Sequence, residues 1–297
     1  MRKIIFTLLF ISLLLPVVSD SANAAIVSDR GYRAEQRQIN KENIKQIKEL
    51  FRLHTQYANK HDVKSLEPLY ADNYINNDGF NKEVYFKSIK STWEACEDLT
   101  YSTNILSINV NGDNASVNVE ETANGTIKET IDTVPVSGEI HSISKSIYQL
   151  VKINDKWYIS GETSITDESS LLYGDARFMN IEIQSPQQVG AGENYTVTLK
   201  VDADKDTFIV GSIDRDPVVY PTQTPKSELR AMPQSQILER IIRANTDNIN
   251  EYAVASMAIS KDKNKGESNF SIYMAGLACV MKRINVIPKN NHIKLED

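Results

Sequence analysis

Histidine and carboxylate side chains are the groups in this chain best suited to moving protons. Glu120 and His141 both fall in segments that we expect to form a sheet. A histidine or a carboxylate beside a second polar group can act as a general acid or base, and a tyrosine hydroxyl can stabilise a developing oxyanion. His141 and Glu120 are therefore the candidates for catalysis, although no complete catalytic motif accompanies them.

Four aromatic side chains are candidates for ligand contact. Tyr57 lies one helical turn from His54, which we place at the edge of that helix. Tyr70 and Tyr74 lie at the end of a second predicted helix and just beyond it, and Trp93 lies near the end of a third. Because aromatic residues at helical spacing usually belong to a core, a core role and a ligand pocket are both open for these four residues.

Three aspartates, Asp202, Asp204 and Asp206, alternate along the chain in the manner of calcium ligands. An EF-hand loop that begins at Asp202 needs glycine at its sixth position and glutamate at its twelfth, but Thr207 and Ile213 stand there. A solvated hairpin tip fits this segment better, and the aspartates stay an alternative metal site. The chain has no Gly-x-Ser-x-Gly elbow and no glycine-rich phosphate loop, and we expect no cofactor.

The first half of the chain has the pattern of helices followed by strands. Helical periodicity predicts helices over 40–59, 63–70 and 81–96, with Asn81 as the N-cap of the third. From Leu106 the period changes to two, and Asn111-Gly112-Asp113 predicts a hairpin turn. Longer strands are expected over 140–153 and 157–166. Residues 40–166 thus indicate an α+β domain with an antiparallel sheet.

The second half indicates mostly strands. Residues 167–177 are polar and are interpreted as a linker, and alternating segments over 178–184, 195–201, 208–210, 252–259 and 270–287 predict strands. Residues 235–245 have a helical period. The expected second domain, residues 178–290, is therefore an all-β sandwich with one inserted helix.

The amino terminus has the pattern of an export signal. Arg2 and Lys3 precede an apolar run from Ile4 to Val18, and Ala22-Asn23-Ala24 has the small side chains that a signal peptidase requires. The run is shorter than the roughly 20 residues that span a bilayer. We therefore predict a cleaved signal peptide over 1–24, a polar, mobile segment over 25–39, and export to the periplasm or the extracellular space.

The amino-acid composition limits the classes of partner that this protein is expected to bind. Removal of residues 1–24 takes away Arg2, Lys3 and Asp20, which changes the formal net charge from −6 to −7. This acidic balance argues against nucleic acid as a partner, and the chain lacks the Lys/Arg cluster that anionic lipid selects. Stable membrane insertion is not expected after cleavage. Cys96 and Cys279 are either a disulfide or two buried thiols.

Several fragments of the first half resemble the nuclear-transport-factor-2-like superfamily, particularly its SnoaL-like branch. The fragments are Leu69-Tyr70-Ala71-Asp72-Asn73-Tyr74, Asp78-Gly79, Lys82-Glu83, Ile108-x-Val-x-Gly-Asp-x-Ala115-x-Val117, and Tyr148-x-Leu150-x-Lys152-Ile-Asn-Asp-Lys156-Trp157-x-Ile159. The resemblance covers residues 40–166 and implies a sheet curled around helices, with a pocket inside this cone. The second half resembles immunoglobulin-like sandwiches in pattern only.

Two functions are consistent with these observations. The first is an exported binding or assembly protein whose cone holds a small apolar or amphipathic ligand or a peptide, and whose sandwich contacts an envelope or extracellular partner. Homodimer formation through the open sheet face is part of this hypothesis. The second is an acid/base enzyme, namely an isomerase, dehydratase or hydrolase that uses His141 or Glu120 in the cone. Members of the superfamily include both classes, so fold alone does not choose between them.

Overall fold

The computed structural model describes residues 20–131, 134–204, 206–221, 228–262 and 271–289. The chain divides into two units, Met1–Lys45 and Gln46–Asp297, which are described separately. The apolar run of the predicted signal peptide lies outside the described residues. Among the described residues, none of the helices is both long enough and apolar enough to span a bilayer.

The described residues of the first unit belong to helix α1, Asp20–Ala58, which continues into the second unit. The segment 25–39, predicted to be a mobile terminus, is therefore helical, and the predicted cleavage site after Ala24 lies within α1. This part of the helix has no apolar stripe, because such a stripe reports burial and not helix formation itself. The segment is rich in Gln, Glu, Arg and Ala, which favour a helix without such a stripe.

The second unit begins with short helical elements. Helix α2 spans Val63–Leu66, and a 3₁₀ turn, η1, follows over Glu67–Leu69. The predicted helix over 63–70 is thus shorter, and Tyr70 instead begins strand β1, Tyr70–Asn76. Helix α3 spans Lys82–Ala95 and confirms the predicted N-cap, because Asn81 Oδ1 accepts a hydrogen bond of 3.0 Å from the amide of Val84.

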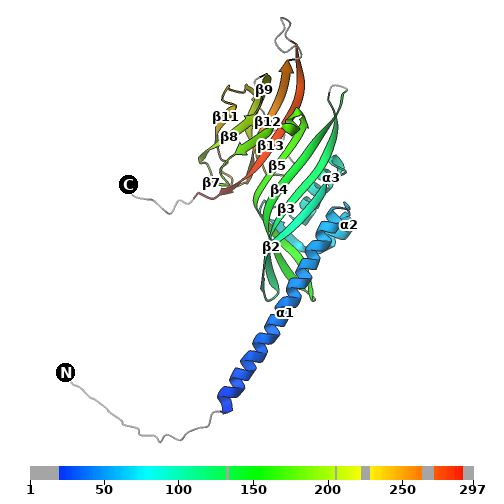
Figure 1. Cartoon of the computed structure of the whole chain (residues 1–297). Coiled ribbons are helices and arrows are strands. Elements are labelled where there is room, and N and C mark those ends of the chain that lie inside the picture. The colour runs from blue at the N-terminus through cyan, green and yellow to red at the C-terminus, as the bar shows by residue number, and fades with distance from the viewer. Residues whose placement is uncertain (1–19, 132–133, 205, 222–227, 263–270, 290–297) are drawn as a thin grey trace, which may run out of the picture. The chain divides into compact units, whose positions relative to one another are not determined.

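One large sheet dominates the second unit (Figure 1). Its strands are β2 (Thr100–Asn111), β3 (Asn114–Ile131), β4 (Val134–Ile153), β5 (Lys156–Gly174), β13 (Ile272–Ile287), β12 (Glu251–Asp262), β9 (Thr207–Pro217) and β10 (Arg230–Ala231), in that spatial order. Strand β1 pairs in parallel with β5, and β7, Gln188–Gly190, pairs with β13. The predicted hairpin turn joins β2 to β3, with Gly112 at φ +60°. The layout is mostly sheet with few helices, in the order of an α+β chain.

The predicted linker over 167–177 is wrong. Residues up to Gly174 belong to β5, and the rest enter a 3₁₀ turn, η2, Asp175–Phe178. Strand β5 pairs with β4 from Lys156 to Tyr173, with two register shifts, and its end, from Glu168 to Gly174, also pairs with β13. A polar segment can belong to a strand when its polar groups have partners. The buried polar groups of this segment find partners, as Asp167 does by accepting a hydrogen bond of 2.5 Å from Tyr252 OH.

The predicted helix over 235–245 is also wrong. Residues Ile237–Arg243 form strand β11, which pairs with β8, Asn194–Asp202, along all of its length. Strand β6, Asn180–Gln184, completes this three-stranded sheet. Leu238 and Ile242 are buried, whereas Ile241 is 73% exposed. A spacing of four residues places side chains on one face of a helix and of a strand alike, so periodicity over this short segment could not separate the two.

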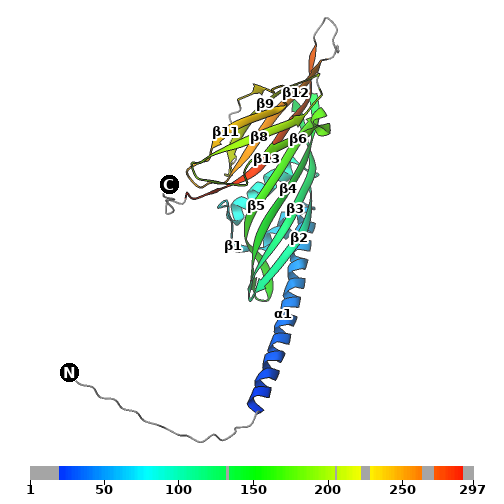
Figure 2. The same ribbon diagram turned by 60° about the vertical axis from the view of Figure 1, so that its left-hand side comes forward.

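Two hydrophobic cores lie along the large sheet. The first core joins residues of α1 and α3 to β3, β4 and β5, including Phe51, Trp93 and Ile159. Figures 1 and 2 show α2 and α3 on the same side of these strands. The second core joins β9, β12 and β13 to β6, β8 and β11, including Leu199 and Ile259. Strand β5 reaches from one core region to the other.

Candidate functional site

The interior of the first core is occupied by tyrosine side chains. Tyr70 and Tyr74 from β1, Tyr85 from α3 and Tyr148 from β4 all pack there. Tyr70 is in edge contact with Tyr74, with ring centroids 5.0 Å apart. Burial is the main cause that raises the pKa of all four hydroxyls, so each stays protonated. Two of the four aromatic residues predicted to contact a ligand, Tyr70 and Tyr74, therefore belong to the packed interior of the first core.

His54 lies inside this tyrosine cluster, contrary to the expectation that it sits at an edge. It is 8% exposed, and its Nε2 lies 2.8 Å from Tyr70 OH, which donates onward to Tyr85 OH at 3.4 Å. Burial lowers the pKa of His54, while the charge of Glu121 opposes that shift. The imidazole is thus favoured in its neutral form. Its Nδ1 is buried without a hydrogen-bond partner among the described residues.

Glu121 connects the cluster to the surface. Tyr148 OH donates to Glu121 Oε2 at 2.9 Å, and Thr103 Oγ1 donates to Oε1 at 3.0 Å. Thr55 Oγ1 of α1 lies 2.9 Å from Thr103 Oγ1. The sequence contained a signal for this residue, because Glu121 continues the inward alternation of Ala115, Val117 and Val119 on β3.

Glu162 is a second carboxylate that the sequence analysis missed. Ser146 Oγ donates to its Oε1 at 2.9 Å, and Tyr74 OH donates to Oε2 at 3.3 Å. Burial of the carboxyl and the nearby charge of Glu121 raise the pKa of Glu162 to about 7, although both hydrogen bonds oppose the shift. Irregular pairing beside Gly161 changes which face the following residues occupy, so alternation along β5 could not have located Glu162.

An open groove of about 510 Å³ lies between α1 and β2. We call it the α1–β2 groove, and its lining residues are Lys48, Phe51, Arg52, Thr55, Gln56, Asn59, Thr103 and Ile105. Ile105 supplies apolar surface, whereas Phe51 borders the groove with only 2% of its surface exposed. The hydroxyls of Thr55 and Thr103 connect the groove to Glu121. Arg52 is exposed and pairs with Glu49 at 2.7 Å. None of the eight lining residues is acidic.

The sequence-predicted catalytic residues do not meet in this region. His141 is exposed, and its Nδ1 lies 2.8 Å from Asn124 Oδ1. Glu120 pairs with Lys145 at 3.3 Å. Both side chains alternate with residues of the first core and therefore lie on the opposite face of the sheet. Neither forms a hydrogen bond with the tyrosine cluster.

The four aromatic residues predicted to contact a ligand do not all lie together in the structure. Tyr70 and Tyr74 are together in the tyrosine cluster. Trp93 stacks on His61 with ring centroids 4.7 Å apart, and its Nε1 donates to Tyr101 OH at 2.9 Å. Tyr57 packs against the first core without a described hydrogen bond to the other three. Of these four residues, only Tyr70 and Tyr74 are in ring contact with each other in the described part of the chain.

The aspartates that suggested calcium do not form a metal site among the described residues, where no group of three potential ligands lies close enough to hold an ion. Asp202 and Asp204 line a pocket of about 270 Å³ beside Lys261, whose Nζ donates to Asp175 at 2.7 Å. Asp206 is not among the lining residues. The pocket therefore offers mixed charge, which does not suit a divalent cation.

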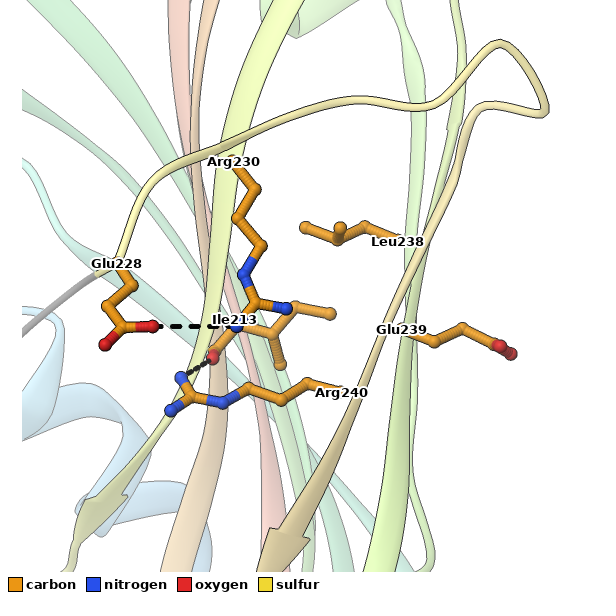
Figure 3. A pocket seen from close by; sticks show the side chains of 6 residues that line it. All are labelled: Ile213, Glu228, Arg230, Leu238, Glu239 and Arg240. Atoms are coloured by element: carbon orange, nitrogen blue, oxygen red, sulfur yellow. Dashed lines mark hydrogen bonds and ion pairs between the residues drawn. The ribbon is translucent and has the colours of Figure 1, made fainter.

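A smaller pocket between β9 and β11 is shown in Figure 3. Arg240 donates to the carbonyl of Ile213 and pairs with Asp214, while Glu228 pairs with Arg230 at 3.6 Å. The space left among these side chains is too narrow for a water molecule. We assign it no ligand.

The two cysteines are both free. Cys96 is buried in the first core, and Cys279 lies on β13, where Ser256 Oγ is 3.8 Å from its sulfur. Burial is the main cause that raises the pKa of both thiols. They behave as small apolar residues with little thiolate character.

No family model and no curated protein matches this sequence. Solved structures match part of it. A protein proposed to be a scytalone dehydratase, from Novosphingobium aromaticivorans, aligns with a TM-score of 0.37 at 14% identity, over 43% of this chain and 86% of that chain. The protein Kfla4162 of Kribbella flavida aligns with a TM-score of 0.37 at 12% identity, over 42% and 90% of the two chains.

Another match is the hexachlorocyclohexane dehydrochlorinase LinA-type3 of Novosphingobium barchaimii. It has a TM-score of 0.34 at 14% identity and covers 42% of this chain and 86% of that chain. The similarity to these dehydratase and dehydrochlorinase structures is therefore confined to less than half of the chain. At such scores it carries no argument about activity.

Proposed function

We propose that the protein is an exported binding protein that holds an amphipathic, acidic ligand in the α1–β2 groove. One observation carries the proposal: the groove offers about 510 Å³ of open space, whereas tyrosines fill the interior beside it. Ligand sites typically occupy roughly 300–1,000 Å³. Ile105 supplies an apolar contact, and Lys48 supplies positive charge together with Arg52, which also pairs with Glu49.

The proposal includes a nuclear-transport-factor-2-like architecture for residues 40–166. The order of helices α1 to α3 followed by the antiparallel strands β2 to β5 supports it. In this architecture the ligand would normally enter the cone. Here the buried tyrosines move the proposed site to the flank of the cone, where Thr55 and Thr103 still connect it to Glu121 and Tyr148.

Export and contact with a partner complete the proposal. The apolar run from Ile4 to Val18 and the Ala22-Asn23-Ala24 sequence support cleavage after Ala24 and release into the periplasm or the extracellular space. The second half, which we propose to be an immunoglobulin-like sandwich, would contact an envelope or extracellular protein. Amino-terminal sequencing of the exported protein should begin at Ala25, and a mature chain that still carries residues 1–24 would refute cleavage.

Calorimetric titration with dodecanoate tests the proposed groove, because this probe combines an alkyl chain with one carboxylate. Replacing both cations, Lys48→Glu with Arg52→Glu, should weaken binding by about tenfold or more through charge repulsion. The matched control is Lys87→Glu, an exposed lysine on α3 that pairs with Glu83. Failure of dodecanoate to bind, or equal loss in both variants, would count against the proposed groove.

Acid/base catalysis is a second candidate because Glu162 has a pKa of about 7, near the working pH of a general acid or base. A substrate would have to reach Glu162 through the tyrosine cluster. Incubating a metabolite extract with the wild type and with Glu162→Gln, followed by mass spectrometry, tests this function. A compound consumed by the wild type alone would support it, and identical profiles would refute it.

A further inference from the structure

Strand β2 is a terminal strand of the large sheet, and one of its edges faces the α1–β2 groove. The side chains of Tyr101, Thr103 and Ile105 alternate with exposed residues along β2. In an antiparallel pair, successive residues direct their main-chain groups alternately toward and away from the neighbouring strand. The amides and carbonyls of one alternate set of β2 residues are thus directed away from β3, toward α1.

Asn59, in the turn that follows α1, identifies that set. Its Nδ2 donates to the carbonyl of Tyr101 at 2.9 Å, and its Oδ1 accepts from the amide of Tyr101 at 2.6 Å. A side-chain amide therefore makes at Tyr101 the two hydrogen bonds that a neighbouring strand would make. Thr103 and Ile105 follow at two-residue intervals, before the register changes at Leu106. Their main-chain groups accordingly point away from β3, along the same edge that Asn59 covers at Tyr101.

The groove is lined on one side by these two residues and on the other by α1. Thr103 and Ile105 are two residues apart, about 7 Å along the strand, and a partner strand would lie about 4.8 Å from β2. Along α1, Lys48 supplies a cation and Arg52, which also pairs with Glu49, supplies a second, and no lining residue is acidic. Exposed sheet edges are sites at which a further strand can pair.

We propose that the α1–β2 groove binds an extended peptide segment with acidic side chains, which pairs with Thr103 and Ile105 as an added strand. This inference rests on the proposed binding function and specifies its ligand class. Main-chain hydrogen bonds provide the affinity, and the charges of Lys48 and Arg52 select acidic side chains. Asn59 occupies the adjoining position of the edge and so fixes where the added strand ends.

Synthetic peptides test the strand pairing. The probe is an acetylated hexapeptide of alternating valine and aspartate, followed by hydrogen exchange of the Thr103 and Ile105 amides. Binding should slow exchange of both amides by about tenfold at saturation, while the same peptide with lysine in place of aspartate should have little effect. Two further peptides are N-methylated at the valines or at the aspartates. Because only one alternate set of amides faces β2, one of these two peptides should lose binding and the other should retain it.

A variant of the protein provides the complementary test. Ile105→Pro removes one outward amide without removing a hydrogen bond to β3. This variant should bind the peptide with about tenfold lower affinity, whereas Ile105→Val should bind it as the wild type does. If Ile105→Pro fails to fold, the two methylated peptides still test whether the ligand pairs with β2 as a strand. Equal binding of both methylated peptides would refute strand pairing.

The remaining outcomes separate this inference from the proposed function. If dodecanoate binds and no peptide does, the groove is still a ligand site, but the proposal that its ligand is a peptide is refuted. Binding of neither probe would count against both. Light scattering that reports a dimer in which the Thr103 and Ile105 amides are already protected would show that a second copy of this chain occupies the edge, and would likewise overturn the proposal.

Discussion

Among individual residues, Glu162 is the carboxyl whose ionisation the fold opposes most clearly. Burial and the charge of Glu121 raise its pKa to about 7, from an ordinary value of 4.5. Its protonated form is therefore stabilised by folding, and its charged form is penalised. The stabilising contribution is complete below pH 4.5 and is lost as the pH rises toward and through 7.

Replacing Glu162 with glutamine should remove this pH dependence. The stability of Glu162→Gln relative to the wild type should increase by on the order of 3 kcal/mol between pH 4.5 and pH 8, as measured by urea unfolding at several pH values. His54, whose pKa burial lowers, makes both proteins less stable as the pH falls below about 6.5, and this effect cancels in the difference. Glu120→Gln is the matched control, and a constant difference across the pH range would contradict the prediction.

Among the elements, β11 shows how a helical period can occur in a strand. A helix over 235–245 would place Ile241 on the buried face, whereas the strand buries Ile242 and leaves Ile241 exposed. Pairing with β8 satisfies the backbone of β11, and the second core buries Leu238 and Ile242. Long-range pairing has thus decided between two conformations that the local pattern allows.

Two lysine substitutions distinguish these conformations. Ile242→Lys should destabilise the protein by about 3 kcal/mol or more, because it buries an unpaired charge in the second core. Ile241→Lys should change the free energy of unfolding by less than about 0.5 kcal/mol, because this side chain is 73% exposed. Thermal and urea unfolding would measure both effects, and greater damage from Ile241→Lys would support the helix instead.

The turn between β1 and α3 is bound to β13 by a buried ion pair. Arg283 donates to both carboxylate oxygens of Asp78, and their side chains are 2% and 6% exposed. Asn250 Nδ2 also donates to Asp78 at 2.7 Å. Removing one partner of such a pair leaves the other charge buried and unpaired.

Asp78→Ala should therefore cost about 3–5 kcal/mol of unfolding free energy, as measured by urea unfolding. The double variant Asp78→Ala with Arg283→Met should recover much of this loss, because no unpaired charge is then buried. Asp72→Ala removes an exposed carboxylate paired with Lys82 at 3.5 Å, and should cost less than about 1 kcal/mol. Equal losses of unfolding free energy at Asp78 and Asp72 would show that the buried ion pair stabilises the protein no more than the exposed one does.

Across the Gln46–Asp297 unit, β5 makes the two cores parts of one sheet. The strand pairs with β4 along its length and with β13 at its end. Where β5 ends, Gly174 has φ +57°, and a Cβ there would lie 2.2 Å from the carbonyl oxygen of Ala275. Only glycine fits this close approach. We therefore expect the two core regions to unfold together.

The tryptophans report on this coupling, because Trp93 and Trp157 both lie in the first core, whereas Leu199 is fully buried in the second. Leu199→Ala should destabilise the second core by about 2–5 kcal/mol. If the cores are coupled, the same loss should lower the midpoint of the tryptophan fluorescence transition, in step with far-UV circular dichroism. An unchanged fluorescence midpoint would show that the two regions unfold independently.

The sequence by itself determined the features that depend on neighbouring residues. Asn81 identified the start of α3, Asn111-Gly112-Asp113 identified the β2–β3 hairpin, and alternating apolar residues identified the strands around it. Each of these signals acts over a few residues, through a capping hydrogen bond, a turn conformation or the alternation of a strand. The order of helices before sheet followed from them.

Only the tertiary structure decided which polar residues face inward and which strands are joined. Glu162, Asp167 and Asp78 are polar residues in the sequence, but each is partly buried in the fold, where a distant hydroxyl or guanidinium supplies its partner. The extension of β5 and the pairing of β11 likewise depend on strands far along the chain. The α1–β2 groove exists because α1 lies beside a strand more than 40 residues later, as the contact of Thr55 with Thr103 shows. Local patterns contain no information about such partners, and long-range packing and hydrogen bonding therefore determine the site.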